Sequence, residues 1–242
     1  MNIKWFIPRE HGAWAMLIVP LLLGTFISNP SFTHLYFIIG VLSLYFGTGP
    51  LLAYIRKPRL GKTVLPSFMI YTICGLIFLV PVLYKHPFLL LFSFAIIPLF
   101  FVNILFARKR NERSFSNDLV AILALSFLVP MTYYIGNNAM TSEALILMSL
   151  NFAFFIGSVF HVKTFIREKD NKKFLRLSNG YHGATVIIPF LIGYPIFALA
   201  FAFSTIKTWV MPKGLKIKPI TLGLVELTNS IFFVLVILLF RT

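Results

Sequence analysis

The chain has 242 residues, of which 58% are hydrophobic and 12% are charged, and its mean hydropathy is +0.87. Soluble domains are about 45–50% apolar and about 25% charged, so this composition excludes a water-soluble globule. The net charge of +15 would suggest nucleic acid in a soluble protein, but here the cations stand in short loops between apolar runs. In that setting they set topology and contact anionic lipid, and we expect no nucleic-acid partner.

Apolar runs of membrane-spanning length follow one another along the whole chain. A span needs about 20 mainly apolar residues. Such runs are predicted at 11–28, 35–55, 63–84, 87–107, 118–135, 142–160 and 220–240. The first run follows PREHG rather than a basic stretch, so we expect a retained membrane helix and not a removable signal peptide.

The segment 183–206 has two interpretations. As one helix it gives eight spans, and as a hairpin turning at 193–195 it gives nine spans with two short arms. The hairpin is favoured, because it returns the basic loop at 207–218 to the side that holds the other basic loops. The sequence therefore predicts an all-α fold, a polytopic transmembrane helical bundle of eight to nine spans that forms a single membrane domain over residues 1–242.

Basic residues gather in alternate loops. These loops are 56–62, 108–117 and 161–182. The other loops, at 29–34, 85–86 and 136–141, together hold one Lys or Arg residue, Lys85. Because cytoplasmic loops accumulate Lys and Arg, this asymmetry predicts that the N-terminus lies in the cytoplasm.

The segment 161–182, HVKTFIREKDNKKFLRLSNGYH, brings carboxylates, cations and imidazoles closer together than any other part of the chain. We interpret it as a cytoplasmic loop that binds an anion, because arginine forks suit phosphate and histidine can exchange a proton near neutral pH. The candidate catalytic residues here are His161, Glu168 and His182, and the candidate ligand-binding residues are Lys163, Arg167 and Asp170. The alternative is an ordinary loop that is basic for topology alone.

A second candidate set stands where the first span begins. Arg9 and Glu10 could bind and orient an anionic head group, His11 is a candidate catalytic residue, and Trp14 lies beside them. The alternative is a helix start anchored at the membrane interface. Within the spans, Asn103, Asn151 and Ser158 are interpreted as packing residues, whereas Glu226, close to the start of the last span, needs a partner.

The stretch PREHGAWAMLIVPLLLG at 8–24, together with REK after the sixth span, resembles the YwiC-like family of bacterial integral membrane proteins. That resemblance covers the whole chain. It implies a multi-pass protein of the bacterial cell membrane and assigns no activity.

The layout is more distantly similar to the UbiA superfamily of intramembrane prenyltransferases, which have nine helices and an Arg before a Pro and a Gly in the first helix. Arg9, Pro20 and Gly24 occupy those places here. In the second acidic motif of that superfamily, Arg167 and Glu168 match an Arg-Asp pair, while Asp170 is out of step.

The first acidic motif of the UbiA superfamily has no counterpart, because no acidic residue occurs between Glu10 and Glu112. Prenyl transfer in that superfamily uses magnesium held by both motifs. One aligned carboxylate cannot hold two such ions by itself. The cofactor is therefore unknown, with Mg²⁺ as the candidate that the resemblance implies. The cations of the loop 56–62, Arg56 and Arg59 among them, could bind a diphosphate in place of the missing motif.

The leading hypothesis is a protein that binds an amphipathic lipid, isoprenoid or anionic-headed, at a cavity on the cytoplasmic side. The expected lining is Arg9, His11, Arg56, His161, Arg167, Glu168 and His182. If it is an enzyme, the reaction is a group transfer with arginines on phosphate and a histidine as acid or base. The alternatives are a small transporter or a non-catalytic membrane scaffold, and the oligomeric state is not predicted.

Overall fold

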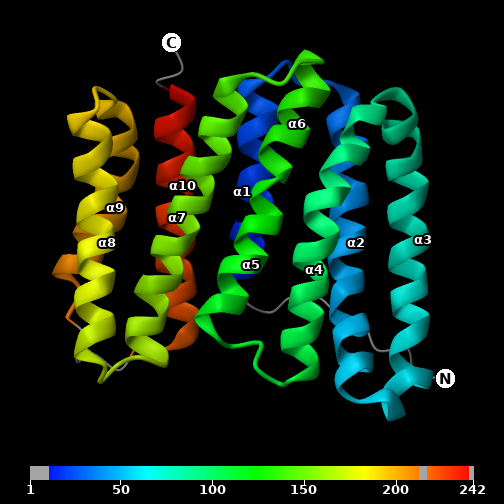
Figure 1. Cartoon of the computed structure of the whole chain (residues 1–242), viewed down its shortest axis with the longest axis horizontal. Coiled ribbons are helices and arrows are strands. Elements are labelled where there is room, and N and C mark those ends of the chain that lie inside the picture. Colours follow the sequence, from blue (N-terminus) through cyan, green and yellow to red (C-terminus); the bar gives the residue numbers. More distant parts are fainter. Residues whose placement is uncertain (1–10, 213–216, 240–242) are drawn as a thin grey trace. The chain divides into compact units, whose positions relative to one another are not determined.

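The computed structural model describes residues 11–212 and 217–239, except the side chain of His11. All regular structure in these ranges is helical (Figure 1). The elements are α1 (His11–Ile27), α2 (Phe32–Arg56), η1 (Pro58–Leu60), α3 (Gly61–Lys85), η2 (Pro87–Phe92), α4 (Ser93–Arg108), α5 (Phe115–Ser126), α6 (Leu128–Asn137), α7 (Ser142–Ile166), α8 (Lys172–Leu191), α9 (Pro195–Val210) and α10 (Pro219–Leu239).

Over these same ranges, six helical segments are long and apolar enough to cross a membrane. They are Phe32–Arg56, Pro58–Lys85, Pro87–Arg108, Phe115–Asn137, Ser142–Ile166 and Pro219–Leu239. The helices α1 and α9 are apolar but shorter. The predicted fold class, an all-α polytopic membrane bundle, is therefore confirmed. Eight or nine full crossings stay a prediction, because they depend on how α1, α8 and α9 meet the membrane.

The contacts divide the chain into two compact units. Unit 1 contains Pro20–Met148, and unit 2 contains 149–239 together with 11–19. The helices α1 and α7 therefore each supply one part to each unit. The single membrane domain predicted from the sequence stays a prediction.

The predicted break in the segment 183–206 is confirmed, but its arms were placed wrongly. Helix α8 ends at Leu191 and α9 begins at Pro195, with Gly193 at φ 87° in the turn between them. A positive φ favours glycine, and proline suits the first position of a helix, so these residues specify the turn. Helix α8, however, begins at Lys172 rather than near residue 183, which makes it 20 residues long.

In unit 1, small residues bring helices into close contact. Helix α2 packs along α3 where Gly40 faces Gly75, and a Cβ on either glycine would lie 3.2 Å from the carbonyl oxygen of the other. The second half of α1 meets α6 in the same way, because a Cβ on Gly24 would collide with Thr132 and with the backbone of Val129. Small residues at such contacts are typical of membrane helices, which associate by close packing and not by the hydrophobic effect.

The predicted span at 118–135 is divided into α5 and α6. Pro130 has no N–H to donate to the carbonyl of Ser126, and its ring crowds that carbonyl, so the helix is interrupted at Phe127. Before the break, Asn103 of α4 donates to the Asn117 side chain of α5 at 2.9 Å. This contact agrees with the packing role that the sequence suggested for Asn103.

Alternate loops lie at opposite ends of unit 1. At one end Arg56 of α2 pairs with Glu112 of the α4–α5 loop at 2.9 Å. At the other end Asn29 donates to Asn137 at 2.9 Å, and His86 packs edge-on against Tyr134. The two basic loops of unit 1 thus share one end, as the charge pattern predicts.

Burial, reinforced by the neighbouring Lys85, lowers the pKa of His86 at the far end.

Unit 2 is a second bundle of apolar helices. Helix α8 packs antiparallel along α9, and α9 packs along α10. Its core contains an aromatic stack in which Phe154 of α7 lies 4.2 Å from Phe233 of α10, measured between ring centroids, and Phe201 of α9 packs on Phe233 at 5.7 Å. Tyr181 of α8 donates to the carbonyl of Ala153 at 2.9 Å and so joins α8 to α7.

Candidate functional site

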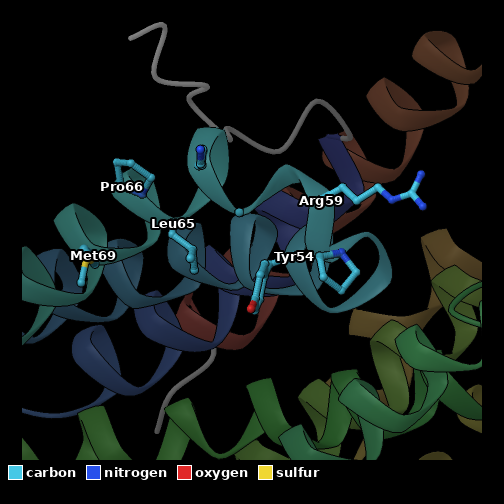
Figure 2. Close-up of a pocket in the computed structure, with 8 residues that line it drawn as sticks. Tyr54, Arg59, Leu65, Pro66 and Met69 are labelled. Carbon is cyan, nitrogen blue, oxygen red and sulfur yellow. The ribbon is translucent and has the colours of Figure 1, made fainter.

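The first candidate site is an open groove of about 560 Å³ in unit 1, where α2 turns into α3. The turn follows from Pro58, because a residue before proline avoids the helical region, and Lys57 accordingly has φ −143° and ψ 82°. Figure 2 shows Tyr54 from α2 and Leu65, Pro66 and Met69 from α3 along the groove. Its remaining lining residues are Pro58, Arg59, Gly61 and Lys62.

The groove has a cationic part and an apolar part. Arg59 and Lys62 are exposed, and neither pairs with a carboxylate among the residues that the structure covers. Leu65 and Met69 follow on α3, one and two turns beyond Gly61. The groove can therefore take a ligand with an anionic group at one end and hydrocarbon at the other.

Arg56, another predicted ligand-binding residue, does not line this groove. Its guanidinium pairs with Glu112, and its Nε donates to the carbonyl of Leu52 at 3.3 Å. The pair is partly exposed, so it contributes at most about 1 kcal/mol to stability. Arg56 therefore serves first to join α2 to the α4–α5 loop.

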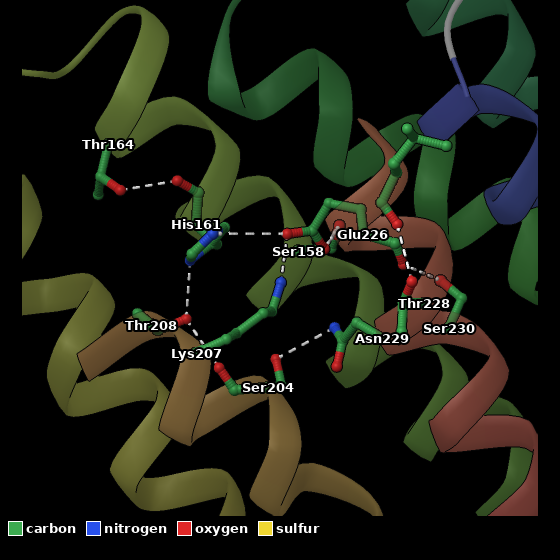
Figure 3. A network of polar contacts seen from close by, with 11 residues as sticks. Ser158, His161, Thr164, Ser204, Lys207, Thr208, Glu226, Thr228, Asn229 and Ser230 are labelled. Atoms are coloured by element: carbon green, nitrogen blue, oxygen red, sulfur yellow. Dashed lines mark hydrogen bonds and ion pairs between the residues drawn. The ribbon is translucent and has the colours of Figure 1, made fainter. Parts of the chain in front are cut away.

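The second candidate site is a buried polar cluster in unit 2, drawn in Figure 3. Three helices supply it, and all of its members are buried. The cluster comprises Ser158 and His161 of α7, Ser204, Lys207 and Thr208 of α9, and Glu226 of α10. Residues three and four positions apart share one face of a helix, which is why the two residues of α7 and the three residues of α9 point to the same place.

Glu226 is the centre of this cluster and is 2% exposed. Its Oε2 accepts from the Ser158 hydroxyl at 2.7 Å, and its Oε1 pairs with the ammonium of Lys207. The Nε2 atom of His161 lies 3.7 Å from the same Oε1. The predicted need of Glu226 for a partner is therefore confirmed, and the partners are a lysine, a serine and a histidine.

The sequence interpretation missed Lys207. It was assigned to a basic loop at 207–218, but α9 continues to Val210, and Lys207 is 8% exposed inside the helix. Ser204, Lys207 and Thr208 stand at helical spacing before Pro212. That spacing of polar residues at the end of an apolar run could have indicated a buried polar face.

The interpretation of 161–182 as one loop is wrong. Helix α7 continues to Ile166 and α8 begins at Lys172, so only residues 167–171 connect them. His161 is completely buried, and His182 of α8 is 1% exposed with its Nδ1 at 2.7 Å from the carbonyl of Ser178. Helical periodicity explains the pattern, because Ser178 and His182 form the buried face of α8 while Lys172, Lys173 and Arg176 form its exposed face.

The short loop at 167–171 holds three of the predicted site residues. Arg167 and Asp170 are exposed, and Glu168 accepts from the Asn171 side chain at 2.8 Å. Asn171 in turn caps α8 by accepting from the backbone of Phe174. In this arrangement the Glu168 carboxylate supports the start of a helix. Lys163, the remaining residue of this set, is buried one turn before the loop.

The structure describes only part of the N-terminal candidate set. Arg9 and Glu10 lie outside the described residues, and so does the side chain of His11, whose backbone begins α1. Trp14 is half-buried near the start of α1. Across the described ranges, no group of three or more His, Cys, Asp or Glu side chains gathers as a metal site would need.

The helical architecture and its six long apolar segments, over the residues that the structure describes, define this protein as a polytopic, all-α membrane protein. The family of YwiC-like proteins matches residues 7–133. An uncharacterised protein of Bacillus subtilis (strain 168), YwiC, is 32% identical over 99% of this chain and all of its own length. An uncharacterised protein of Haemophilus influenzae (strain ATCC 51907 / DSM 11121 / KW20 / Rd) is 30% identical over 97% of this chain and 98% of its own. The chain belongs to the YwiC-like family, and no solved structure matches it significantly.

Proposed function

We propose that this protein binds an amphipathic lipid with an anionic head group at the groove between α2 and α3. The observation that carries the proposal is that one groove is lined both by the cations Arg59 and Lys62 and by the apolar residues Leu65 and Met69. A phosphate-bearing lipid has the same division, and each basic residue near an anionic membrane surface contributes about 1 kcal/mol to attraction. Membrane lipids and isoprenoid phosphates are the proposed ligands.

The proposal includes a location in the bacterial cell membrane with the N-terminus in the cytoplasm. Two basic loops share one end of unit 1, joined by the Arg56–Glu112 pair, and basic loops favour the cytoplasmic side. The groove at η1 belongs to that end, so its ligand would come from the inner leaflet.

Removing both groove cations should weaken lipid binding. With Arg59→Ala and Lys62→Ala combined, we expect roughly 30-fold weaker binding of phosphatidylglycerol, from about 1 kcal/mol for each charge. The measurement is native mass spectrometry of the purified protein in neutral detergent with added phosphatidylglycerol.

The matched control removes the same charge from the other basic loop of unit 1. Arg108 and Lys109 are exposed at the end of α4, and the combined Arg108→Ala and Lys109→Ala variant should bind lipid nearly as the unmodified protein does. Equal losses in both double variants would mean that only net charge matters, and the proposed groove would be wrong.

Group transfer, which the resemblance to the UbiA superfamily implies, is a separate proposal, because Glu168 belongs to unit 2 and the groove belongs to unit 1. In that case Glu168 would hold Mg²⁺ on a diphosphate, and Glu168→Gln should abolish magnesium-dependent release of pyrophosphate from a prenyl diphosphate. Asp170→Asn, in the same exposed loop, tests the other predicted carboxylate separately. If Glu168→Gln releases pyrophosphate as fast as the unmodified protein, this carboxylate has no role in transfer. If the unmodified protein releases no pyrophosphate, the group-transfer proposal is wrong and the lipid-binding proposal is unaffected.

A small transporter is the second candidate, and the buried cluster around Glu226 is the observation that favours it. Ionisable side chains buried inside a helical membrane bundle commonly mark ion pathways. Solute uptake into liposomes that depends on a pH gradient, and that Glu226→Gln abolishes, would support transport over lipid binding.

A further inference from the structure

We propose that His161 and Glu226 form a proton-binding site inside unit 2, in which Nε2 of His161 takes up the proton. The inference does not depend on the lipid groove, which lies in unit 1 and shares no residue with this site. It is based on hydrogen-bond directions, on the charges around the ring, and on the depth of the cluster along its three helices.

The hydrogen bonds of Thr208 determine which nitrogen of His161 carries hydrogen. The Thr208 hydroxyl donates to the carbonyl of Ser204 at 2.8 Å, so its single hydrogen is already in use. Its oxygen lies 2.9 Å from Nδ1 of His161 and must accept there. Nδ1 therefore bears the hydrogen of the neutral imidazole, and Nε2 keeps its lone pair.

That lone pair faces a carboxylate. Nε2 lies 3.7 Å from Oε1 of Glu226, so the neutral ring presents an acceptor to another acceptor. One added proton changes this contact into an imidazolium–carboxylate pair, which is attractive. The geometry is fixed in advance, because Ser158 holds the other carboxylate oxygen and Thr208 holds the other ring nitrogen.

Charged and titratable groups from three helices face this part of unit 2. Lys207 of α9 pairs with the same Oε1, so Lys207, Glu226 and a neutral His161 together carry no net charge. From α8, Tyr181 and His182 face the same stretch of α7, and they are engaged with the carbonyls of Ala153 and Ser178. Lys163 stands on α7 itself, on the side of the loop 167–171. Proton uptake gives the cluster a charge of +1.

The cluster is close to the helix ends on one side and closed by aromatic rings on the other. His161 is five residues before the end of α7, which is about 7.5 Å along the helix axis. The rings of Phe154, Phe201 and Phe233 pack together about two turns deeper in the same three helices. The cluster therefore lies nearer to the 167–171 end of unit 2 than the aromatic layer does, and we take that end as the side from which the proton comes.

The step is balanced without any further reactant. A hydronium ion from that side loses its proton, an N–H bond forms at Nε2, and water remains. The new N–H then faces the Glu226 carboxylate as an ion-pair partner, while Ser158 stays on the other carboxylate oxygen. Release of the proton breaks the same N–H bond and returns the proton to water.

The test follows the nitrogens of His161 by NMR in the full chain, reconstituted in neutral lipid. His161 precedes Val162, and His-Val occurs once in the chain, so labelling histidine with ¹³C and ¹⁵N and valine with ¹⁵N selects this residue without any mutation. As the pH falls from about 8 to about 4, we expect Nε2 to change from unprotonated to protonated while Nδ1 stays protonated.

Glu226→Gln should lower the midpoint of this transition by about one unit or more, because the carboxylate that favours the charged ring is gone. Thr228→Ala, at an exposed position of the helix that holds Glu226, should leave the midpoint unchanged. The proposal is overturned if Nε2 shows no protonation over this range, if Nδ1 proves to be the unprotonated atom, or if Glu226→Gln leaves the midpoint where it was. The first two outcomes need no variant to fold.

Discussion

Replacing Lys207 by methionine should destabilise the protein by about 3–5 kcal/mol, the largest effect we expect from a single substitution. Lys207→Met leaves the Glu226 carboxylate buried with Ser158 and without its cation. A buried charge that loses its partner costs this much because the environment cannot solvate it. Unfolding of the purified protein in mixed micelles with increasing SDS measures the change.

The reverse substitution should cost less. Glu226→Gln leaves the Lys207 ammonium unpaired, but Lys207 is three residues before the end of α9, and a long lysine side chain can extend toward the interface. Glu226 is seven residues into α10, about two helical turns, and its shorter side chain has no such route. A larger loss of stability in Lys207→Met than in Glu226→Gln would therefore support the position of Lys207 near a helix end and of Glu226 farther from one.

The double variant separates the pair from its neighbours. With Lys207→Met and Glu226→Met together no charge of the pair remains, and we expect a smaller loss than in Lys207→Met alone, because apolar replacement of a buried pair is often tolerated. Thr228→Ala, an exposed position of α10, is the control and should be nearly neutral. The single variants for comparison are Lys207→Met and Glu226→Met. A double variant whose loss of stability equals the sum of those two losses would contradict the ion pair.

Adding one methyl group at Gly24 should also have a large effect, a loss of about 1–3 kcal/mol. The Cβ of alanine would collide with the Thr132 hydroxyl and with the backbone oxygen of Val129 on α6. The hydroxyl can rotate away but the backbone cannot, so the second half of α1 must move off α6. The same SDS titration measures this loss.

Gly12 provides a matched control in the same helix, because a Cβ at Gly12 has nothing within 4 Å. Gly12→Ala should be neutral or slightly stabilising, and by less than the roughly 0.5–1 kcal/mol typical of the middle of a helix, because Gly12 is the second residue of α1. Combining Gly24→Ala with Thr132→Ala should recover part of the loss and not all of it, since the contact with Val129 remains. Equal behaviour of Gly12→Ala and Gly24→Ala would contradict the α1–α6 contact.

Helix positions were predicted well wherever apolar runs had the length of a span. The predicted runs at 35–55 and 63–84 correspond to α2 and α3 within a few residues. Hydropathy is sufficient there, because lipid forces the backbone of an apolar run to satisfy its own hydrogen bonds in a helix. The prediction was wrong where polar residues continue a helix, as at the end of α7, the start of α8 and the end of α9.

The candidate sites were predicted unevenly for a related reason. Glu226 was singled out because a carboxylate in an apolar run needs a partner, but its partner Lys207 was assigned to a loop. Composition cannot distinguish a lysine on an exposed loop from one at the end of a helix whose charge is buried. His161 was predicted to act in a loop with Glu168, and instead it meets Thr208 and Glu226 within the bundle.

The sequence by itself determined the class of protein, because composition, run length and loop charge depend on the amino acids alone. It also determined the turn between α8 and α9, where Gly193 and Pro195 suit one local geometry. Only the tertiary structure decided which polar residues meet. Ser158, Lys207 and Glu226 are far apart in the chain, and their contact depends on how α7, α9 and α10 pack, which no local pattern encodes.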